Sequence, residues 1–179
     1  MRQKMKVVVD LQLASEETNT PSIEQCELAL QQVLTIVAVD DDNDETKECT
    51  LRIVDESESA ALNEQYRGKS GPTNILSFPF ESPAACDLSL LENGLVESEL
   101  LEIELLGDLI ICAPLVVKEA MEQNKSELQH WMHLIIHGGL HLLGYDHEND
   151  ADANMMEKLE CQAMDNLGYP NPYLPTETT

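Results

Sequence analysis

The hydrophobic and polar positions of the chain alternate in some segments and recur every three or four residues in others. Alternating segments that are rich in β-branched residues are typical of strands. The last of these segments is apolar with few interruptions, so we expect that strand to be buried on both faces of a sheet. The predicted strands cover residues 6–13, 50–54, 73–80 and 105–112.

Apolar residues at helical spacing predict five helices between and after these strands. In the second helix we expect Ala60, Ala61 and Leu62 to form the apolar side. Ser126 and Gln129 have the spacing of a capping box, which predicts the start of the fourth helix. The predicted helices cover residues 21–37, 56–66, 114–123, 126–143 and 151–167, and a glycine follows each of the last two.

The mixed order of strands and helices favours an α+β or α/β domain around one sheet of about four strands. A length of 179 residues fits a single domain with a sizeable core, which we expect to span residues 1–170. Residues 171–179 are expected to form a loose C-terminal tail. The acidic stretch 84–104 shows no regular pattern and is expected to form a long loop.

The net charge, the cysteines and the apolar segments of the chain indicate which partners and which cellular location to expect. The chain has a formal net charge of -24, from 10 basic and 34 acidic residues. This excess repels polyanions at long range and argues against non-specific binding of nucleic acid. Five scattered cysteines without a C-x-x-C pattern favour free thiols in a reducing compartment. The sequence lacks a signal-peptide pattern and a membrane-spanning apolar run, so we expect a cytoplasmic protein without membrane contact.

All five histidines of the chain fall between His130 and His147. His137 and His141 are four residues apart, so a helix places them on one face, one turn apart. Gly144 allows the chain to turn back after the helix, and His147 follows three residues later. Three neutral imidazoles leave a fourth position for water, which is the pattern of a catalytic zinc site. We therefore predict one zinc ion on His137, His141 and His147.

The remaining histidines, His130 and His133, are predicted to pack in the interior or to support the ligands. His133 shares a helix face with His137, but it lies eight residues, about 12 Å along a helix, from His141. Because of that separation it cannot bind the same ion as His141. Asp146, which precedes the third predicted ligand, is expected either to orient that imidazole or to act as a turn residue.

The spacing H-x3-H-x2-G-x2-H is that of the metzincin proteases, which carry a glutamate base directly after the first histidine. In this chain that position is Gly138. A peptidase with this mechanism would therefore lack its base, and another group would have to handle the proton.

A second polar cluster lies in Y-R-G-K-S-G-P-T-N-I-L-S-F-P, residues 66–79. It contains Arg67, Lys69, Asn74 and Ser77, in a chain with only 10 basic residues. One interpretation is a phosphate site, because arginine is suited to bidentate contact with phosphate. The alternative is that the cluster is a solvated helix end. Spacing alone leaves both interpretations open.

The histidine segment H-G-G-L-H-L-L-G-Y-D-H and the 66–79 segment together closely resemble the YbeY family, bacterial endoribonucleases of ribosomal RNA maturation. The segments L-L-G-D-L-I-I-C-A-P, 105–114, and M-E-x-x-E…L-G-Y-x-N-P-Y, 156–173, are also similar to that family. The chain departs from the family pattern at Ser70, where aspartate is common.

This resemblance implies an α+β fold with a mostly parallel sheet of about four strands, surrounding helices and a central metal-binding helix. It implies a zinc ion on His137, His141 and His147, and Arg67 as the catalytic residue that faces the metal. The implied activity is cleavage of single-stranded RNA in 16S rRNA 3′-end maturation and ribosome quality control. The implied partners are ribosomal RNA, the small ribosomal subunit and a ribosome-assembly GTPase, with the oligomeric state left open.

Two other functions compete with this one. A metallopeptidase-like hydrolase would use the same histidines, but the glycine at 138 and the Arg67 segment count against it. A non-catalytic ribosome-assembly factor would keep zinc for structure, but three ligands rather than four count against that role. Because the net charge opposes RNA, a ribonuclease would need a local positive cleft, for which Arg67, Lys69 and the zinc ion are the candidates.

Overall fold

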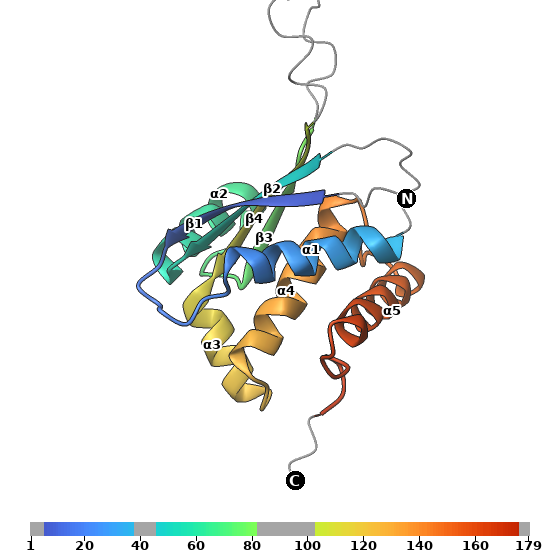
Figure 1. Cartoon of the computed structure of the whole chain (residues 1–179). Coiled ribbons are helices and arrows are strands. Elements are labelled where there is room, and N and C mark those ends of the chain that lie inside the picture. Colours follow the sequence, from blue (N-terminus) through green and yellow to red (C-terminus); the bar gives the residue numbers. More distant parts are fainter. Residues whose placement is uncertain (1–5, 38–45, 82–102, 176–179) are drawn as a thin grey trace, which may run out of the picture.

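The computed structural model describes residues 6–37, 46–81 and 103–175 of the chain (Figure 1). Most of the acidic stretch 84–104 and the end of the expected tail, 176–179, lie outside the described residues. The strands are β1 (Lys6–Ala14), β2 (Thr46–Val54), β3 (Ile75–Pro79) and β4 (Ile103–Cys112). The helices are α1 (Ile23–Val37), α2 (Glu56–Arg67), α3 (Ala113–Glu122), α4 (Glu127–Leu142) and α5 (Asp150–Asn166).

The strands form one sheet in the order β1-β2-β4-β3. Strands β1, β2 and β4 run parallel, and β3 pairs antiparallel with β4 at one edge. Helices α1 and α4 lie on one face of the sheet, α2 lies on the other, and α5 packs outside α1 and α4 (Figure 1). The predicted single α+β domain with a mostly parallel four-stranded sheet is confirmed.

Helix α4 lies at the centre of the core, as a helix that is apolar on most of its circumference must. Its residues Trp131, Ile135 and Leu140 are each at most 1% exposed. Two adjacent glycines let the helix lie close to its neighbours on both sides. A Cβ atom at Gly138 would lie 2.6 Å from Ile75 of β3, and one at Gly139 would lie 2.8 Å from a side-chain atom of α1. This close packing places the end of α4 beside the edge strand β3.

The expectation that β4 is buried on both faces is wrong for its first half. Ile103, Leu105 and Asp108 are exposed, whereas Leu109 and Ile111 are fully buried. The first half of β4 extends beyond the helices that cover the sheet (Figure 1). Only the second half of β4 has packing partners on both faces. An apolar run alone did not reveal how much of the strand the helices cover.

The expected apolar side of α2 is also wrong. The buried residues of this helix are Ser59 and Asn63, not the segment 60–62. The Ser59 hydroxyl donates to the carbonyl of Thr73 at 2.7 Å and accepts from the Thr73 amide at 3.0 Å. The Asn63 side chain donates to the carbonyl of Gly71 at 2.8 Å. The polar side of α2 therefore holds the loop that leads into β3.

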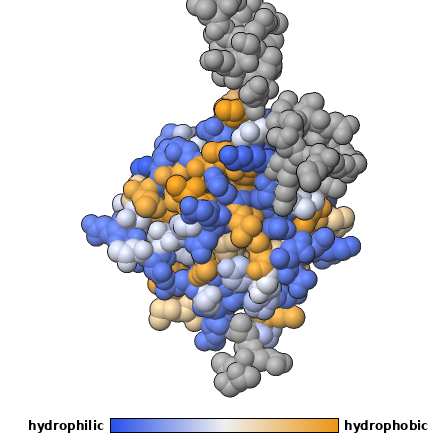
Figure 2. All heavy atoms as spheres, in the orientation of Figure 1, coloured by the Kyte–Doolittle hydropathy of each residue, from blue (hydrophilic) through white to orange (hydrophobic). Residues whose placement is uncertain are grey.

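Four of the five cysteines fall within the described residues and are free thiols: Cys26, Cys49, Cys112 and Cys161. Within the same residues, no helix combines the length and the hydrophobicity needed to cross a bilayer. On the face seen in Figure 2, hydrophilic residues are interspersed with smaller groups of hydrophobic ones.

Candidate metal centre

The three predicted histidine ligands lie at the C-terminal end of α4 and in the turn that follows it. His137 and His141 occupy its last two turns. The helix ends at Leu142, and Gly144 in the turn after it has a φ of 91°. The Gly144 amide donates to the His141 carbonyl at 3.0 Å, and the Tyr145 amide donates to the Leu140 carbonyl at 3.1 Å. This is a Schellman motif, and it turns the chain back so that His147 faces the helix end.

The three imidazole rings lie together as the spacing predicts. The Nε2 atoms of His137 and His141 are 3.1 Å apart. The ring of His147 has its centroid 5.2 Å from that of His141 and 5.9 Å from that of His137. Two nitrogen ligands of one tetrahedral zinc ion would lie about 3.4 Å apart. The first two imidazoles therefore already stand at a distance that suits a shared ion.

A buried carboxylate fixes the orientation of His137. Glu160 of α5 is 0% exposed, and its Oε1 atom contacts Nδ1 of His137. Burial alone would raise the pKa of Glu160, but the nearby His133 imidazole and hydrogen bonds with His137 and Tyr173 outweigh burial and lower that pKa to about 2. The carboxylate is therefore ionised and accepts a hydrogen bond from the Nδ1–H group of His137. This leaves the lone pair of the His137 Nε2 atom free for a metal ion, as in the carboxylate–histidine pairs of zinc sites.

The pKa of His141 is lowered, first by burial and then by the neighbouring His137 and His147 imidazoles. Its neutral form is therefore favoured, and only a neutral imidazole can donate a lone pair to a metal. A tautomerically fixed imidazole, a neutral imidazole and a third ring within reach form a donor set that fits zinc.

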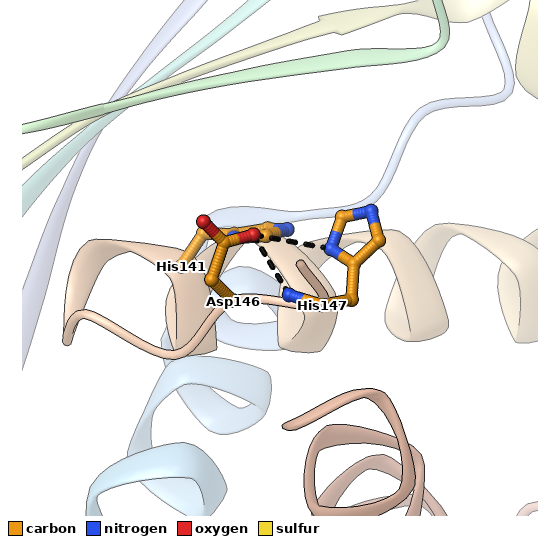
Figure 3. Close-up of side chains that lie close together, drawn as sticks. All are labelled: His141, Asp146 and His147. Atoms are coloured by element: carbon orange, nitrogen blue, oxygen red, sulfur yellow. Dashed lines mark hydrogen bonds and ion pairs between the residues drawn. The ribbon is translucent and has the colours of Figure 1, made fainter. Parts of the chain in front are cut away.

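Asp146 adds a carboxylate to this group. Donor atoms of His141, Asp146 and His147 all lie within 4.8 Å of one another (Figure 3). The Oδ1 atom of Asp146 accepts from the amide of His147 at 2.7 Å and lies 3.4 Å from Nδ1 of the same residue. The side chain of His147 is 59% exposed, so its ring is free to turn towards the other imidazoles. Asp146 is placed either to orient His147 or to bind the ion itself.

Arg67 shares one cleft with the histidines. This cleft has a volume of about 760 Å³. Its lining includes Arg67 and the three histidines His137, His141 and His147. Arg67 is the last residue of α2, directly before the loop that Ser59 and Asn63 hold. Its guanidinium forms no hydrogen bond or ion pair with the residues that the structure describes. All of its donors therefore remain available for a ligand.

The other polar residues of the Arg67 segment separate into two groups. Asn74 and Ser77 line the cleft, whereas Lys69 does not. Lys69 follows Gly68, which ends α2, so the chain turns away from the cleft at this point. Within the described part of the chain, Arg67 is the single lysine or arginine of the cleft lining and Asp146 is its single carboxylate.

His130 and His133 do not line this cleft. They line a smaller cavity of about 350 Å³, which His137 also borders. His130 contacts Glu119 of α3 at 2.7 Å, and Nε2 of His133 lies 3.6 Å from Glu160. Burial would raise the pKa of Glu119, but hydrogen bonds from His130 and Asn74 outweigh it and lower that pKa. Each of the two histidines therefore lies beside a carboxylate, Glu119 being partly exposed and Glu160 buried.

Sequence reasoning placed Glu160 and its partner Tyr173 in the family-like segment 156–173 but assigned neither of them a role. Tyr173 belongs to the expected tail, yet its hydroxyl donates to Glu160, and the carbonyl of Pro172 accepts from Lys125. A sequence signal for Glu160 did exist. It occupies the same helical stripe as the buried residues Met156, Ala163 and Met164, where an apolar residue would be expected.

The position of Gly138 bears on the peptidase alternative. A Cβ atom there would lie 2.6 Å from Ile75 and 2.7 Å from Leu109 of the sheet, on the side of α4 that packs in the core. A side chain at this position would start against these two side chains, which would have to shift to admit it. The observed packing therefore fits glycine at this position and disfavours the glutamate base of the metzincin motif.

Comparison with known proteins gives two results. A family model described as "Endoribonuclease YbeY" matches residues 12–168. Among solved structures, the chain is similar to the solution structure of TM1509 from Thermotoga maritima, with a TM-score of 0.51 and 20% sequence identity. That similarity covers 95% of this chain and 100% of the other, and it supports the fold described above.

Proposed function

The chain belongs to the YbeY family of endoribonucleases, and we propose that it is a zinc-dependent enzyme that cleaves single-stranded RNA at the histidine cleft. We further propose 16S rRNA 3′-end maturation and ribosome quality control as its roles. One observation carries this proposal: Arg67 and the three histidines, far apart in the sequence, line the same cleft.

His137, His141 and His147 are the proposed ligands of one zinc ion. When bound, zinc would supply Lewis acidity, which polarises a phosphoryl oxygen and acidifies a water molecule. The chain's own contribution is to hold the imidazoles in place. Glu160 fixes the tautomer of His137, and the turn at Gly144 brings His147 back towards the helix. Asp146 is proposed to orient His147, because its carboxylate already contacts that residue.

Arg67 is the proposed catalytic residue. Its guanidinium offers planar donors that match a phosphate, and no described residue occupies them. It would bind the scissile phosphate and stabilise the negative charge that develops in the transition state. Ser77 lines the same wall and would offer a neutral hydrogen bond to the RNA backbone. Asn74 also lines it, but its amide already donates to Glu119 and accepts from the Ile75 amide.

The products distinguish two routes for the attack on the phosphodiester. If the RNA 2′-hydroxyl attacks, the upstream product ends in a 2′,3′-cyclic phosphate. If water attacks directly, no cyclic phosphate forms. Gly138 supplies no base, because glycine has no side chain.

The peptidase alternative loses its main support, since the position of the protease base is buried. A non-catalytic assembly factor remains an outcome of the test below. Ribosomal RNA, the small ribosomal subunit and a ribosome-assembly GTPase are the proposed partners, and the cytoplasm is the proposed location.

The test compares cleavage of a precursor 16S rRNA fragment by the wild type, His141→Ala and His133→Ala, purified in parallel and analysed for zinc. We expect cleavage by the wild type and His133→Ala, and loss of both zinc and cleavage in His141→Ala. Equal cleavage by all three would indicate a contaminating nuclease. No cleavage by any of them, on the fragment or on immature small subunits, would contradict the proposed activity and favour the assembly factor.

A further inference from the structure

Aromatic residues are scarce in this chain but gather at the cleft. The sequence contains two phenylalanines, one tryptophan and four tyrosines. Three of these seven residues, Tyr66, Phe78 and Tyr145, line the cleft that holds Arg67 and the histidines. Tyr66 directly precedes Arg67 and is 58% exposed. A large ring exposed at the mouth of a ligand cleft indicates a contact surface for a ligand.

Tyr66 is held in place from the side. Its ring and that of Phe78 have centroids 5.0 Å apart and planes at 67°, an edge-to-face contact. Such a contact uses an edge of one ring and a face of the other. At least one face of Tyr66 is therefore not covered by Phe78, which agrees with its high exposure. The tyrosine therefore offers an exposed ring face in the cleft that Arg67 also lines.

We propose that Tyr66 is a stacking platform for an RNA base that neighbours the phosphate bound by Arg67. This rests on the proposed endoribonuclease function and adds a substrate-positioning residue to it. Unpaired bases stack on tyrosine rings without regard to sequence, whereas bases within a duplex already stack on one another. Stacking on Tyr66 therefore gives a physical reason for a preference for single strands.

Stacking also suits the charge of this protein. With a net charge of -24 and one arginine in the described cleft lining, few cations are available for phosphates. Stacking depends little on ionic strength, whereas each phosphate contact adds to the salt dependence of binding. Tyr66 and Arg67 should therefore contribute to binding in ways that salt titration separates.

The test uses Tyr66→Ala, Tyr66→Phe and Tyr66→Leu, where leucine still covers Phe78 but offers no flat ring. Cleavage and binding are measured on single-stranded RNA, and on RNAs with one abasic residue placed in turn at each position near the cleavage site. We expect Tyr66→Phe to behave like the wild type. Tyr66→Ala and Tyr66→Leu should raise KM on the order of tenfold, with kcat and the salt slope little changed.

The abasic RNAs identify the stacked base. We expect the wild type to lose on the order of tenfold in affinity at one abasic position, and Tyr66→Leu to lose nothing further there. If Tyr66→Leu cleaves as well as the wild type, or remains equally sensitive to every abasic position, the platform is refuted while the nuclease stands. If the wild type neither binds nor cleaves single-stranded RNA, the proposed function itself fails and the platform with it.

Discussion

Replacing Glu160 by glutamine tests whether the buried carboxylate supports the metal site. Glu160 contacts Nδ1 of His137 and the hydroxyl of Tyr173, and none of its surface is exposed. Glutamine has nearly the same shape and can still accept a hydrogen bond from His137. The substitution therefore removes the charge while leaving the packing of α5 in place.

The expected effect is weaker zinc binding. Removing a hydrogen-bond partner of a ligand histidine costs about 10- to 100-fold in metal affinity, which corresponds to about 1.4–2.8 kcal/mol. Because glutamine keeps one acceptor for Nδ1, Glu160→Gln should fall near the lower end of this range. Glu160→Ala, which removes the acceptor and leaves a cavity, should fall near the upper end.

The assay is competition for zinc against a chelator of known affinity at neutral pH. Thermal unfolding of the metal-free proteins shows whether each variant is folded. Glu157→Gln is the matched control, because Glu157 is exposed on the same helix. A folded Glu160→Gln protein that binds zinc as tightly as the wild type would refute the argument that Glu160 prepares His137 for the ion.

Three further predictions concern neighbouring residues. His133→Ala should retain one zinc ion by metal analysis while His141→Ala loses it, and loss of zinc from His133→Ala would overturn the ligand assignment. Arg67→Lys should lower kcat/KM for RNA by about 100-fold with zinc binding unchanged, measured by steady-state cleavage; unchanged kinetics would remove Arg67 from the catalytic machinery. Because the pKa of Glu119 is lowered, its carboxylate stabilises the fold above about pH 4.3, and this stability is lost as pH falls through the lower, folded-state pKa. Denaturant unfolding from pH 7 to pH 3 should therefore show a smaller acid loss in Glu119→Gln than in the wild type or in the exposed control Glu122→Gln, and equal losses would contradict the role of this carboxylate.

Local patterns predicted the helices and strands of the fold well. The residues at which these elements begin and end depended on long-range contacts, which a local pattern does not contain. The strand predicted from residue 50 begins at Thr46, because its polar start pairs with both neighbouring strands. Lys47 in that start is only 3% exposed and forms an ion pair with Glu104 of β4. A sequence pattern cannot show that a lysine will be buried when its partner belongs to a distant strand.

The site was predictable where it is local in sequence. The spacing of His137, His141 and Gly144 fixes one helix face and one turn, so these residues were found from the sequence alone. Glu160 was missed because its contact with His137 requires α5 to pack against α4. A glutamate in a buried helical stripe was the available signal. The convergence of Arg67 with the histidines followed from a family resemblance, not from spacing, because it depends on how β3 packs beside α4.

The net charge of -24 and the proposed RNA substrate are compatible if recognition is short-ranged. At physiological ionic strength charges are screened beyond about 8 Å, so distant carboxylates act weakly on RNA that is already in the cleft. Within the cleft, Arg67 and the proposed ion are the positive groups and Tyr66 is an uncharged contact. So few cations would neutralise few phosphates, and we therefore predict weak binding of free RNA. In the proposed role, a ribosomal particle that presents a single-stranded 3′ end would supply the remaining contacts.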